Sequence, residues 1–506
     1  MTTLTDEQTA AADAFHTGHH LVIQAGAGTG KTTTLVQLAA STERRGRYLA
    51  FNKVIARDAA ARFPHTVRCT TAHATAYAAV GHRYASRLNS PRQPAWRIGE
   101  GLGLNRSVRI GDHTISHRTL SHTMLRTVAR FCHSADRVLS DHHVPPLRRL
   151  ESQSSHSELV GFVLPFAAQA WSDLQNTEKG VVRFEHDHYL KIWSLRHPRI
   201  EADFLMLDEA QDTNPVLEQV FASQRDHAQL VMVGDSAQAI YGWRGARDVM
   251  SRFDGVPLTL TRSFRFGPHL ADQANRWLAI ADAPIRLSGT DTITTDIGTV
   301  THPKAVLSRT NVGAMAEVMR LLAENHSVAL VGGGQTLRAL ALAARDLKEG
   351  RRTAHPEGRR TAHPELVLFA SWGDLQDYAA YDPAGKDLQP LVDLIDQHGT
   401  EAILNAVDRL SDESCADVTV STAHKAKGRE WSSVRIADDF PPPKDTDELD
   451  DQGHPIPEPV RDADARLAYV AVTRARLQLD LGGLSWIDDH PGGRQHSSHG
   501  CDEREV

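Results

Sequence analysis

The chain has few cysteines and no long apolar segment. Four of its 506 residues are cysteine (Cys69, Cys132, Cys415 and Cys501), and their scattered positions do not match the paired spacing of a zinc or iron–sulfur site. No apolar run approaches the ~20 residues of a membrane span, and the first residues lack the charged and apolar parts of a signal peptide. The sequence therefore predicts a cytoplasmic protein with reduced thiols and no membrane partner.

Charge of one sign is not in large excess, but it is unevenly distributed. The net charge of −7 does not by itself favour a polyanionic partner. Residues 83–149 nevertheless contain twelve arginines, no lysine and four acidic residues, which predicts either a salt-sensitive contact with a nucleic acid backbone or an ordinary solvated helical face. Residues 437–464 contain ten acidic residues and two basic ones, and predict a solvated loop. The histidine pairs His19–His20 and His142–His143 are also expected to be solvated.

A glycine-rich segment directly follows the apolar run Leu21–Ile23. A short buried strand that turns through glycines into a helix points successive backbone N–H groups at an anion, as in a phosphate-binding P-loop. Lys31 would reach the outer phosphates of a nucleotide, and the hydroxyl of Thr32 would bind Mg²⁺. The residues predicted to contact ATP here are Ala25, Gly26, Ala27, Gly28, Thr29, Gly30, Lys31, Thr32 and Thr33.

A second apolar strand, predicted at residues 203–207, ends in adjacent carboxylates. The carboxyl ends of strands in a doubly wound sheet border the ligand crevice, so Asp208 would lie beside the P-loop and hold the Mg²⁺. Glu209 would point elsewhere and polarise the attacking water. Together the two segments predict a nucleoside triphosphatase.

Seven further segments, in family order, resemble motifs of the UvrD/Rep family of superfamily 1A DNA helicases. The resemblance implies an α/β fold with two RecA-like P-loop motor domains, a helical 1B insertion and a reduced 2B insertion. The sequences at Ala50–Lys53, Tyr189–Trp193 and His424–Trp431 resemble the F-box DNA helicase branch and its bacterial and phage relatives, although no F-box is apparent. The seven segments are Leu4–Gln8, Phe51–Lys53, Thr71–His73, Val233–Ala246, Ser263–Arg265, Thr422–Trp431 and Tyr469–Ala475.

The resemblance implies contacts with the base and sugar of ATP. Gln8 would bind the edge of adenine, and Phe264 would stack on the base where the family has a tyrosine. Glu430 is also implied to contact ATP. Many members carry an arginine beside the base where this chain has Thr33, so the base contact would depend on Phe264 and Gln8.

Three polar side chains are predicted to sense the γ-phosphate. Gln238 follows an apolar strand, so its uncharged amide would lie near the phosphate without competing for the metal. Arg265 and Arg474 would come from the second motor domain and neutralise the charge that develops in phosphoryl transfer, so that hydrolysis requires closure of the two domains. Solvated surface arginines are the alternative interpretation.

Aromatic and polar residues in the motifs are candidates for binding single-stranded DNA. Trp243 stands between a glycine and Arg244, which favours an exposed ring, and stacking on bases tolerates any sequence, as a translocase requires. Polar residues would position the strand through its phosphates and sugars. Core or capping roles remain the alternative for Phe51, His73 and Tyr241, and a buried packing role remains the alternative for Trp243. The predicted DNA-binding residues are Phe51, Asn52, His73, Tyr241, Trp243, Arg244 and His424.

The motifs divide the chain into two motor domains, each interrupted by an insertion. The second insertion is much shorter than in large family members and contains a tandem repeat, Glu349–Pro356 and Glu357–Pro364, which predicts a flexible loop. The predicted units are the first motor domain (residues 1–80 and 199–258), a basic, mostly helical first insertion (81–198), the second motor domain (259–345 and 410–487), a reduced second insertion (346–409) and a disordered tail (488–506).

These features predict a nucleoid-associated, ATP- and Mg²⁺-dependent translocase and helicase. It would move 3′ to 5′ on single-stranded DNA, act at junctions of single- and double-stranded DNA, and serve repair, recombination or replication. One alternative is a translocase that strips recombination proteins from DNA and unwinds poorly by itself. Another is a motor subunit that serves a nuclease partner in repair or anti-phage defence.

Overall fold

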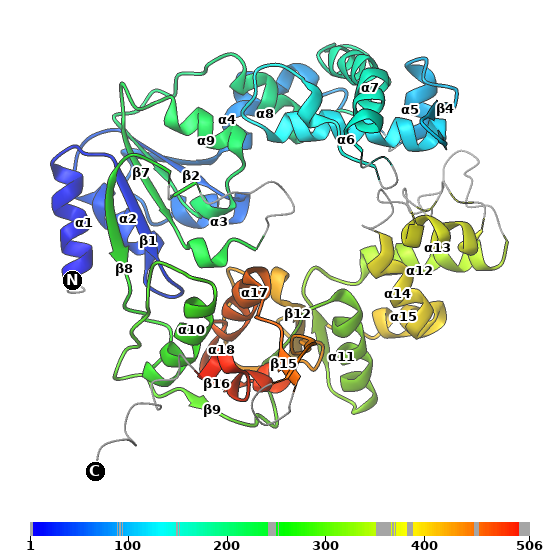
Figure 1. Cartoon of the computed structure of the whole chain (residues 1–506). Coiled ribbons are helices and arrows are strands. Elements are labelled where there is room, and N and C mark those ends of the chain that lie inside the picture. The colour runs from blue at the N-terminus through cyan, green and yellow to red at the C-terminus, as the bar shows by residue number, and fades with distance from the viewer. Residues whose placement is uncertain are drawn as a thin grey trace.

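The computed structural model describes residues 4–88, 90, 93, 95–147, 150, 152–240, 249–250, 252–350, 366, 369, 371–381, 388–449 and 455–494. Two parallel six-stranded sheets, each accompanied by helices, form the two halves of the molecule (Figure 1). The predicted α/β fold with two P-loop-type motor domains is therefore confirmed. Among the described residues, no helix has both the length and the apolar character needed to cross a bilayer.

The first sheet has the strand order β3-β2-β6-β7-β1-β8. Its central strands β6 (Phe204–Leu207) and β7 (Gln229–Gly234) are buried along their whole length, as expected for a parallel sheet with helices on its faces. The remaining strands are β1 (Leu21–Ala25), β2 (Gly46–Ala50), β3 (Val67–Thr71) and β8 (Val256–Leu260), and the helices of this domain are α1 (Asp6–His16), α2 (Lys31–Ala40), α3 (Lys53–Ala60), α4 (Ala72–Ala79) and α9 (Pro215–Ala222).

The first insertion is mostly helical and packs directly on the first sheet. Its buried residues Leu120 and Val163 belong to the same apolar cluster as Leu49 and Leu205 of the sheet. The insertion therefore shares one core with the motor domain. Its elements are α5 (Ala95–Gly101), the hairpin β4 (Val108–Ile110) and β5 (His113–Ile115), α6 (His117–His133), α7 (Gln153–Leu174) and α8 (His186–Ser194).

The second sheet has the strand order β11-β12-β10-β13-β16-β9. The acidic segment that was expected to be a loop instead contains an exposed antiparallel hairpin, β14 (Asp445–Leu449) and β15 (Pro455–Pro457). The sheet strands are β9 (Asp296–Ile297), β10 (Ala305–Ser308), β11 (Val328–Leu330), β12 (Val418–Thr422), β13 (Trp431–Ile436) and β16 (Ala475–Asp480), and the helices are α10 (Pro268–Ile280), α11 (Asn311–Ala323), α16 (Ala423–Ala426) and α17 (Asp462–Val472).

The described part of the second insertion is a helical layer on the second motor domain. Val306 and Val420 of the sheet share one buried cluster with Leu347, Ile395 and Leu404 of the insertion. The repeat at 349–364 lies, apart from its first two residues, outside the described residues. The helices here are α12 (Gln335–Lys348), which begins in the second motor domain and crosses the predicted boundary at 346, α13 (Trp372–Tyr381), α14 (Gln389–His398) and α15 (Thr400–Asp408).

The start of the predicted disordered tail is folded. A short 3₁₀ helix at Gly482–Asp488 is followed by α18 (Pro491–Arg494). Arg276 of α10 holds this segment, because its guanidinium lies 2.5 Å from the carboxylate of Asp488 and donates to the Gly493 carbonyl oxygen at 3.3 Å. The tail that was predicted to be disordered from residue 488 is therefore ordered as far as Arg494. The sequence did not indicate this, because the ion pair joins residues that are distant in sequence.

Candidate nucleotide and DNA sites

The P-loop leaves β1 and enters α2 through two glycines in the left-handed region. Gly28 has φ 77° and Gly30 has φ 80°. A Cβ atom at Gly28 would lie 2.5 Å from the Ser263 hydroxyl, so this position also requires the smallest residue for space. Lys31 Nζ donates to the carbonyl oxygens of Ala25 (3.2 Å) and Gly26 (3.1 Å). The loop thus has the tight glycine turn between strand and helix that the sequence predicts.

The adjacent carboxylates at the end of β6 occupy different environments. Asp208 is buried, and its Oδ2 accepts hydrogen bonds from Thr32 Oγ1 (3.2 Å) and Tyr48 Oη (2.5 Å). Burial and the charge of Glu209 raise the pKa of Asp208. Burial also opposes ionisation of Glu209, but the positive charges of Lys31 and Lys427 outweigh it and lower its pKa. The hydroxyl of Thr32 and the carboxylate of Asp208 are hard oxygen donors that fit Mg²⁺.

A buried network joins the two motor domains behind the P-loop. Tyr469 Oη donates to Asp235 Oδ2 at 2.9 Å and accepts the backbone N–H of Ala27 at 3.0 Å. Gln238 Nε2 donates to the same Asp235 oxygen at 2.7 Å. Tyr469 lies on α17 of the second domain, so one hydroxyl connects that helix to the P-loop. The sequence did not predict this connection, although Tyr469 lies in one of the motifs, because Ala27 and Asp235 are distant from it in sequence.

A buried ion pair makes a second connection between the domains. Lys427 Nζ lies 2.6 Å from Asp212 Oδ2 and donates to the carbonyl oxygen of Gln238 at 2.6 Å. Burial raises the pKa of Asp212 to about 6, although Lys427 opposes that rise. Both Asp212 and Gln238 belong to the first domain, whereas Lys427 follows α16 in the second. The γ-phosphate candidate Gln238 is therefore contacted from the opposite domain.

The two predicted arginines lie at the same domain boundary. Arg265 donates from Nε to Glu430 Oε2 at 2.6 Å and from Nη1 to the Thr473 carbonyl oxygen at 2.9 Å. Arg474 is buried and donates to the Val470 carbonyl oxygen at 2.8 Å. Burial, together with the nearby charge of Arg265, lowers the pKa of Arg474 to about 9. Glu430 is thus an ion-pair partner of Arg265.

A cavity of about 540 Å³ and another of about 330 Å³ lie at the carboxyl ends of the first sheet. The smaller one, here the P-loop cavity, brings together predicted residues from both motor domains. It does not include the predicted residues Gln8, Ala25, Gly26 and Asp208 in its lining. Its lining is Ala27, Gly28, Thr29, Gly30, Lys31, Thr32, Thr33, Arg62, Glu209, Gln238, Phe264, Arg265, Gly428, Glu430, Arg474 and Arg476.

The predicted base contacts Gln8 and Phe264 both lie close to Gly30 of the P-loop. Gln8 Nε2 and a Phe264 ring carbon would each be 3.7 Å from a Cβ atom at Gly30. Gln8 also caps α1 by accepting the backbone N–H of Thr5. Sequence reasoning missed Arg62, whose guanidinium donates to Thr33 Oγ1 at 2.8 Å. Arg62 therefore places a guanidinium beside Thr33, the residue that stands where many family members have an arginine.

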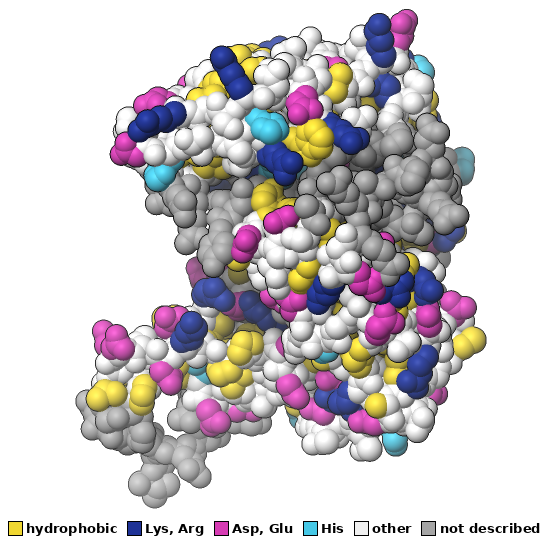
Figure 2. Space-filling view, turned by 90° about the vertical axis from the view of Figure 1, so that its right-hand side faces the viewer, with side chains coloured by type: hydrophobic (Ala, Val, Ile, Leu, Met, Phe, Trp, Pro, Cys, Tyr) yellow, Lys and Arg dark blue, Asp and Glu magenta, His cyan; other side chains and the backbone are white. Residues whose placement is uncertain are grey.

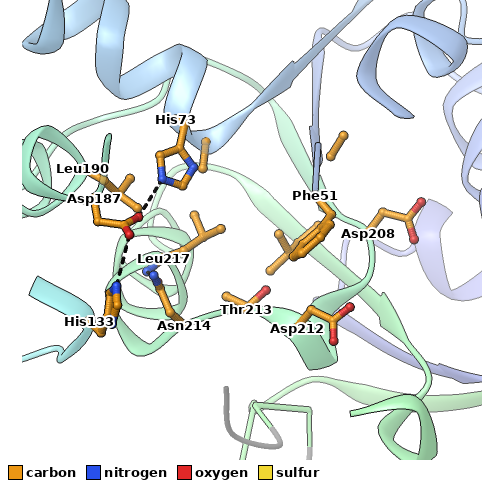
Figure 3. A pocket seen from close by; sticks show the side chains of 13 residues that line it. Phe51, His73, His133, Asp187, Leu190, Asp208, Asp212, Thr213, Asn214 and Leu217 are labelled. Atoms are coloured by element: carbon orange, nitrogen blue, oxygen red, sulfur yellow. Dashed lines mark hydrogen bonds and ion pairs between the residues drawn. The ribbon is translucent and has the colours of Figure 1, made fainter. Parts of the chain in front are cut away.

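The larger cavity, here the Phe51 cavity, lies between the first motor domain and its insertion. The half-exposed ring of Phe51 and the side chain of His73 line it together with Asn214 (Figure 3). Asp187 of α8 accepts from His73 Nε2 (3.0 Å) and from His133 Nε2 of α6 (3.1 Å). Burial opposes ionisation of Asp187, but these histidines hold its pKa well below the ordinary value. The three side chains join α4, α6 and α8.

The other predicted DNA contacts differ in their placement. Tyr241, Trp243 and Arg244 lie outside the described residues, so their roles stay predictions. Asn52 caps α3 by accepting the backbone N–H of Ile55 at 2.9 Å, a role that the sequence reasoning did not anticipate for it. His424 lies on α16, and burial lowers its pKa, with the charge of Arg309 adding to the effect.

The interpretation of His142 and His143 as solvated was wrong for one of the two. His143 is buried, and its Nε2 lies 3.0 Å from Asp136 Oδ2. His142 Nε2 lies 2.7 Å from the same oxygen, and that histidine is exposed. The chain folds back between residues 136 and 142 and places an acid beside the pair, which the sequence spacing did not indicate.

Comparisons with known proteins agree with this arrangement. Residues 8–244 match the family described as AAA domain, and residues 335–483 match the UvrD-like helicase C-terminal domain. F-box DNA helicase protein 1 of Schizosaccharomyces pombe is 30% identical over 92% of this chain and 55% of its own length. F-box DNA helicase 1 of Gallus gallus is 28% identical over 91% of this chain and 47% of its own.

A third similar protein is bacterial. ATP-dependent DNA helicase UvrD2 of Mycobacterium tuberculosis is 27% identical over 57% of this chain and 48% of its own length. The chain thus spans about half the length of the curated relatives it matches. Matches at both ends of the chain cover parts of both motor domains.

Proposed function

The chain belongs to the UvrD-like helicase family and is related to the F-box DNA helicases, and from this premise we propose that it is an ATP-driven translocase and helicase on DNA. It moves 3′ to 5′ on single-stranded DNA and acts at junctions with duplex DNA during repair, recombination or replication. The observation that carries the proposal is the P-loop cavity, because side chains from both motor domains line it.

Charged and polar side chains in the cavity, together with Asp208 beside it, have parts in this proposal. Lys31 leaves its carbonyl partners and binds the outer phosphates, while Thr32 and Asp208 hold Mg²⁺, which neutralises phosphate charge when bound. Glu209 keeps its carboxylate ionised beside Lys31 and orients the attacking water. Arg265 and Arg474 supply positive charge from the second domain.

Closure of the two domains couples hydrolysis to movement. Tyr469 and Lys427 reach from the second domain to Ala27, Asp235 and Asp212 of the first. These contacts surround Gln238, which lines the cavity. Binding or loss of the γ-phosphate would therefore alter the hydrogen bonds of Gln238 with Asp235 and Lys427, two residues that make contacts between the domains. Nucleotide binding and release would in this way alternately close and open the cleft between the domains.

The Phe51 cavity is the proposed site for bases of the single strand. Its half-exposed aromatic ring can stack on a base without reading its identity. For the duplex we propose the tip of the first insertion, where the guanidinium groups of Arg97 and Arg118 lie 5.3 and 5.8 Å from the ring centroid of Trp96. On the face in Figure 2, basic and acidic side chains are interspersed, so a localised contact fits better than a broad basic surface.

Unwinding of tailed duplexes tests the proposal. Duplexes with a 3′ tail, a 5′ tail or no tail are mixed with the protein, ATP and Mg²⁺, and strand separation is followed by fluorescence. We expect unwinding of the 3′-tailed duplex and DNA-stimulated ATP hydrolysis. Preference for the 5′ tail would overturn the direction, and ATP hydrolysis that ignores single-stranded DNA would overturn the translocase proposal.

A further inference from the structure

Tyr48 lies in the middle of β2 and is fully buried. Its ring packs against Phe63, with 4.7 Å between the ring centroids. Its hydroxyl, however, is not in an apolar setting, because Oη donates to Asp208 Oδ2 at 2.5 Å. A side chain that looks like part of the core therefore ends on the carboxylate that the proposed function assigns to Mg²⁺.

The hydrogen bonds of Asp208 restrict the rotation of its carboxylate. Oδ1 accepts the backbone N–H of Glu209 at 2.9 Å, and Oδ2 accepts from Tyr48 and, at 3.2 Å, from Thr32. The Glu209 contact is local, whereas Tyr48 approaches from a neighbouring strand that pairs in parallel with β6. Donors on both oxygens fix the plane of the carboxylate and keep it beside the Thr32 hydroxyl.

We propose that Tyr48 is a positioning residue for Mg²⁺, which holds the Asp208 carboxylate in its metal-binding orientation before the metal arrives. This inference rests on the proposed function, since it concerns the same metal site. Tyr48 has no direct role in the chemistry: it acts only through Asp208.

A tyrosine suits this task better than a charged donor would. The carboxylate of Asp208 is buried beside Glu209, so it needs a donor to replace the hydrogen bonds of water. A lysine or arginine would supply one, but its positive charge would compete with Mg²⁺ for the carboxylate. A neutral hydroxyl fills one lone pair and leaves the negative charge available to the cation.

Nucleotide binding without hydrolysis tests the role of Tyr48. The affinity for a fluorescent ADP analogue is measured in EDTA and over a range of Mg²⁺ concentrations, for the wild type and for Tyr48→Phe. We expect the Mg²⁺ concentration for half-maximal effect to rise about three- to tenfold in the variant, as loss of one hydrogen bond implies. The affinity in EDTA should not change, because the ring and its packing on Phe63 remain.

Two comparisons make the result specific. Tyr84→Phe is the matched control, since Tyr84 is also buried and its hydroxyl donates to the Gln175 carbonyl oxygen in the first insertion, away from the metal site. In an Asp208→Asn background, Tyr48→Phe should no longer change the Mg²⁺ dependence. This double-mutant cycle isolates action through Asp208.

The outcomes separate the two proposals. If the wild type binds the analogue equally with and without Mg²⁺, the proposed metal site is wrong. If Mg²⁺ strengthens binding equally in the wild type and in Tyr48→Phe, the metal site stands and the role of Tyr48 is overturned. Equal weakening of binding in EDTA and in Mg²⁺ would also overturn it, because that pattern indicates a structural defect.

Discussion

The P-loop cavity and the Phe51 cavity share a wall but are built from different parts of the molecule. The segment from Asp208 to Asp212 separates them: Glu209 lines the first, whereas Asp208 and Asp212 line the second. Side chains of both motor domains line the P-loop cavity, and residues 50–217 alone line the Phe51 cavity. Movement of one domain relative to the other therefore changes the first cavity directly and the second only through this wall.

The chemical character of the two cavities differs in the same way. The P-loop cavity contains buried charges in hydrogen-bonded networks, where low dielectric strengthens each interaction. The Phe51 cavity presents a half-exposed ring, an Asp187 carboxylate that accepts hydrogen bonds from two histidines and, at the shared wall, the carboxylates of Asp208 and Asp212. The first is suited to sense a phosphate charge, and the second to hold a flat, neutral base. Variants that affect only one cavity test this division.

The largest effect is expected for Lys31→Ala. Loss of the ammonium group should reduce ATP hydrolysis by roughly 100-fold or more, because it removes a donor to the charge that develops on the phosphates. Single-strand affinity without nucleotide should stay close to wild type and the protein should stay folded, since the hydrogen bonds of Lys31 go to P-loop carbonyls and its charge acts on the carboxylates of the same site. Hydrolysis within a few-fold of wild type would remove the P-loop assignment.

Phe51→Ala should give the converse pattern. If the ring stacks on a base, its loss should weaken single-strand binding by about 1–3 kcal/mol, while ATP hydrolysis without DNA stays unchanged. Val54→Ala is the control, because Val54 is an exposed apolar residue on α3, the helix that directly follows Phe51. Fluorescence anisotropy with a labelled oligonucleotide measures the affinity. Equal weakening by both variants would speak against stacking by Phe51.

The sequence predicts those cavity residues that lie in local motifs and misses those that only the fold brings to the cavity. Lys31, Thr32, Asp208 and Glu209 could be named as candidates because phosphate and metal chemistry require those residue types at the ends of buried strands. Tyr48 was missed because an aromatic residue in the middle of an apolar strand is indistinguishable from core, and only the pairing of β2 with β6 brings it to Asp208.

The same reason explains the other omissions. Arg62 reaches Thr33 across 29 positions of sequence, and Tyr469 reaches Ala27 across 442. No local pattern carries such pairs. The Asp187 bridge in the Phe51 cavity likewise needs His73 and His133 to converge from separate helices. Candidate residues within contiguous motifs could thus be named from the sequence, whereas these contacts, which depend on tertiary packing, could not.

A smaller effect is expected for Tyr469→Phe, which removes one contact between the motor domains. The hydroxyl joins Ala27 of the P-loop to Asp235, so its loss should lower DNA-stimulated ATP hydrolysis several-fold through weaker coupling. Single-strand binding at the Phe51 cavity should not change. The cost in stability should be about 1 kcal/mol, as for one buried hydrogen bond. Steady-state hydrolysis with and without DNA checks this, and an equal loss in both would indicate a defect in the P-loop itself.

The smallest expected effect concerns the pH dependence of the first insertion. Burial lowers the pKa of His188 to about 4, although the charge of Asp187 opposes this. Between pH 6.5 and about 4 the unfolded chain therefore takes up a proton that the folded chain does not, and stability falls as the pH falls. The lowered pKa of Asp187 changes the stability only at pH values below the ordinary pKa of an aspartate, which lie outside this window.

His188→Gln should reduce that acid sensitivity. Glutamine is accepted at this third position of α8, where His188 Nδ1 now accepts the Glu185 N–H, and it does not titrate. Between pH 7 and 4.5 the variant's melting temperature should fall a few degrees less than that of the wild type, because its unfolding no longer includes the uptake of a proton at position 188. The opposite contribution from the raised pKa of Asp212 is present in both proteins and cancels in the comparison. His19→Gln, which replaces an exposed histidine, is the control and should respond to acid as the wild type does. An identical acid response of all three proteins would show that His188 does not determine the acid stability of α8, the helix that carries Asp187.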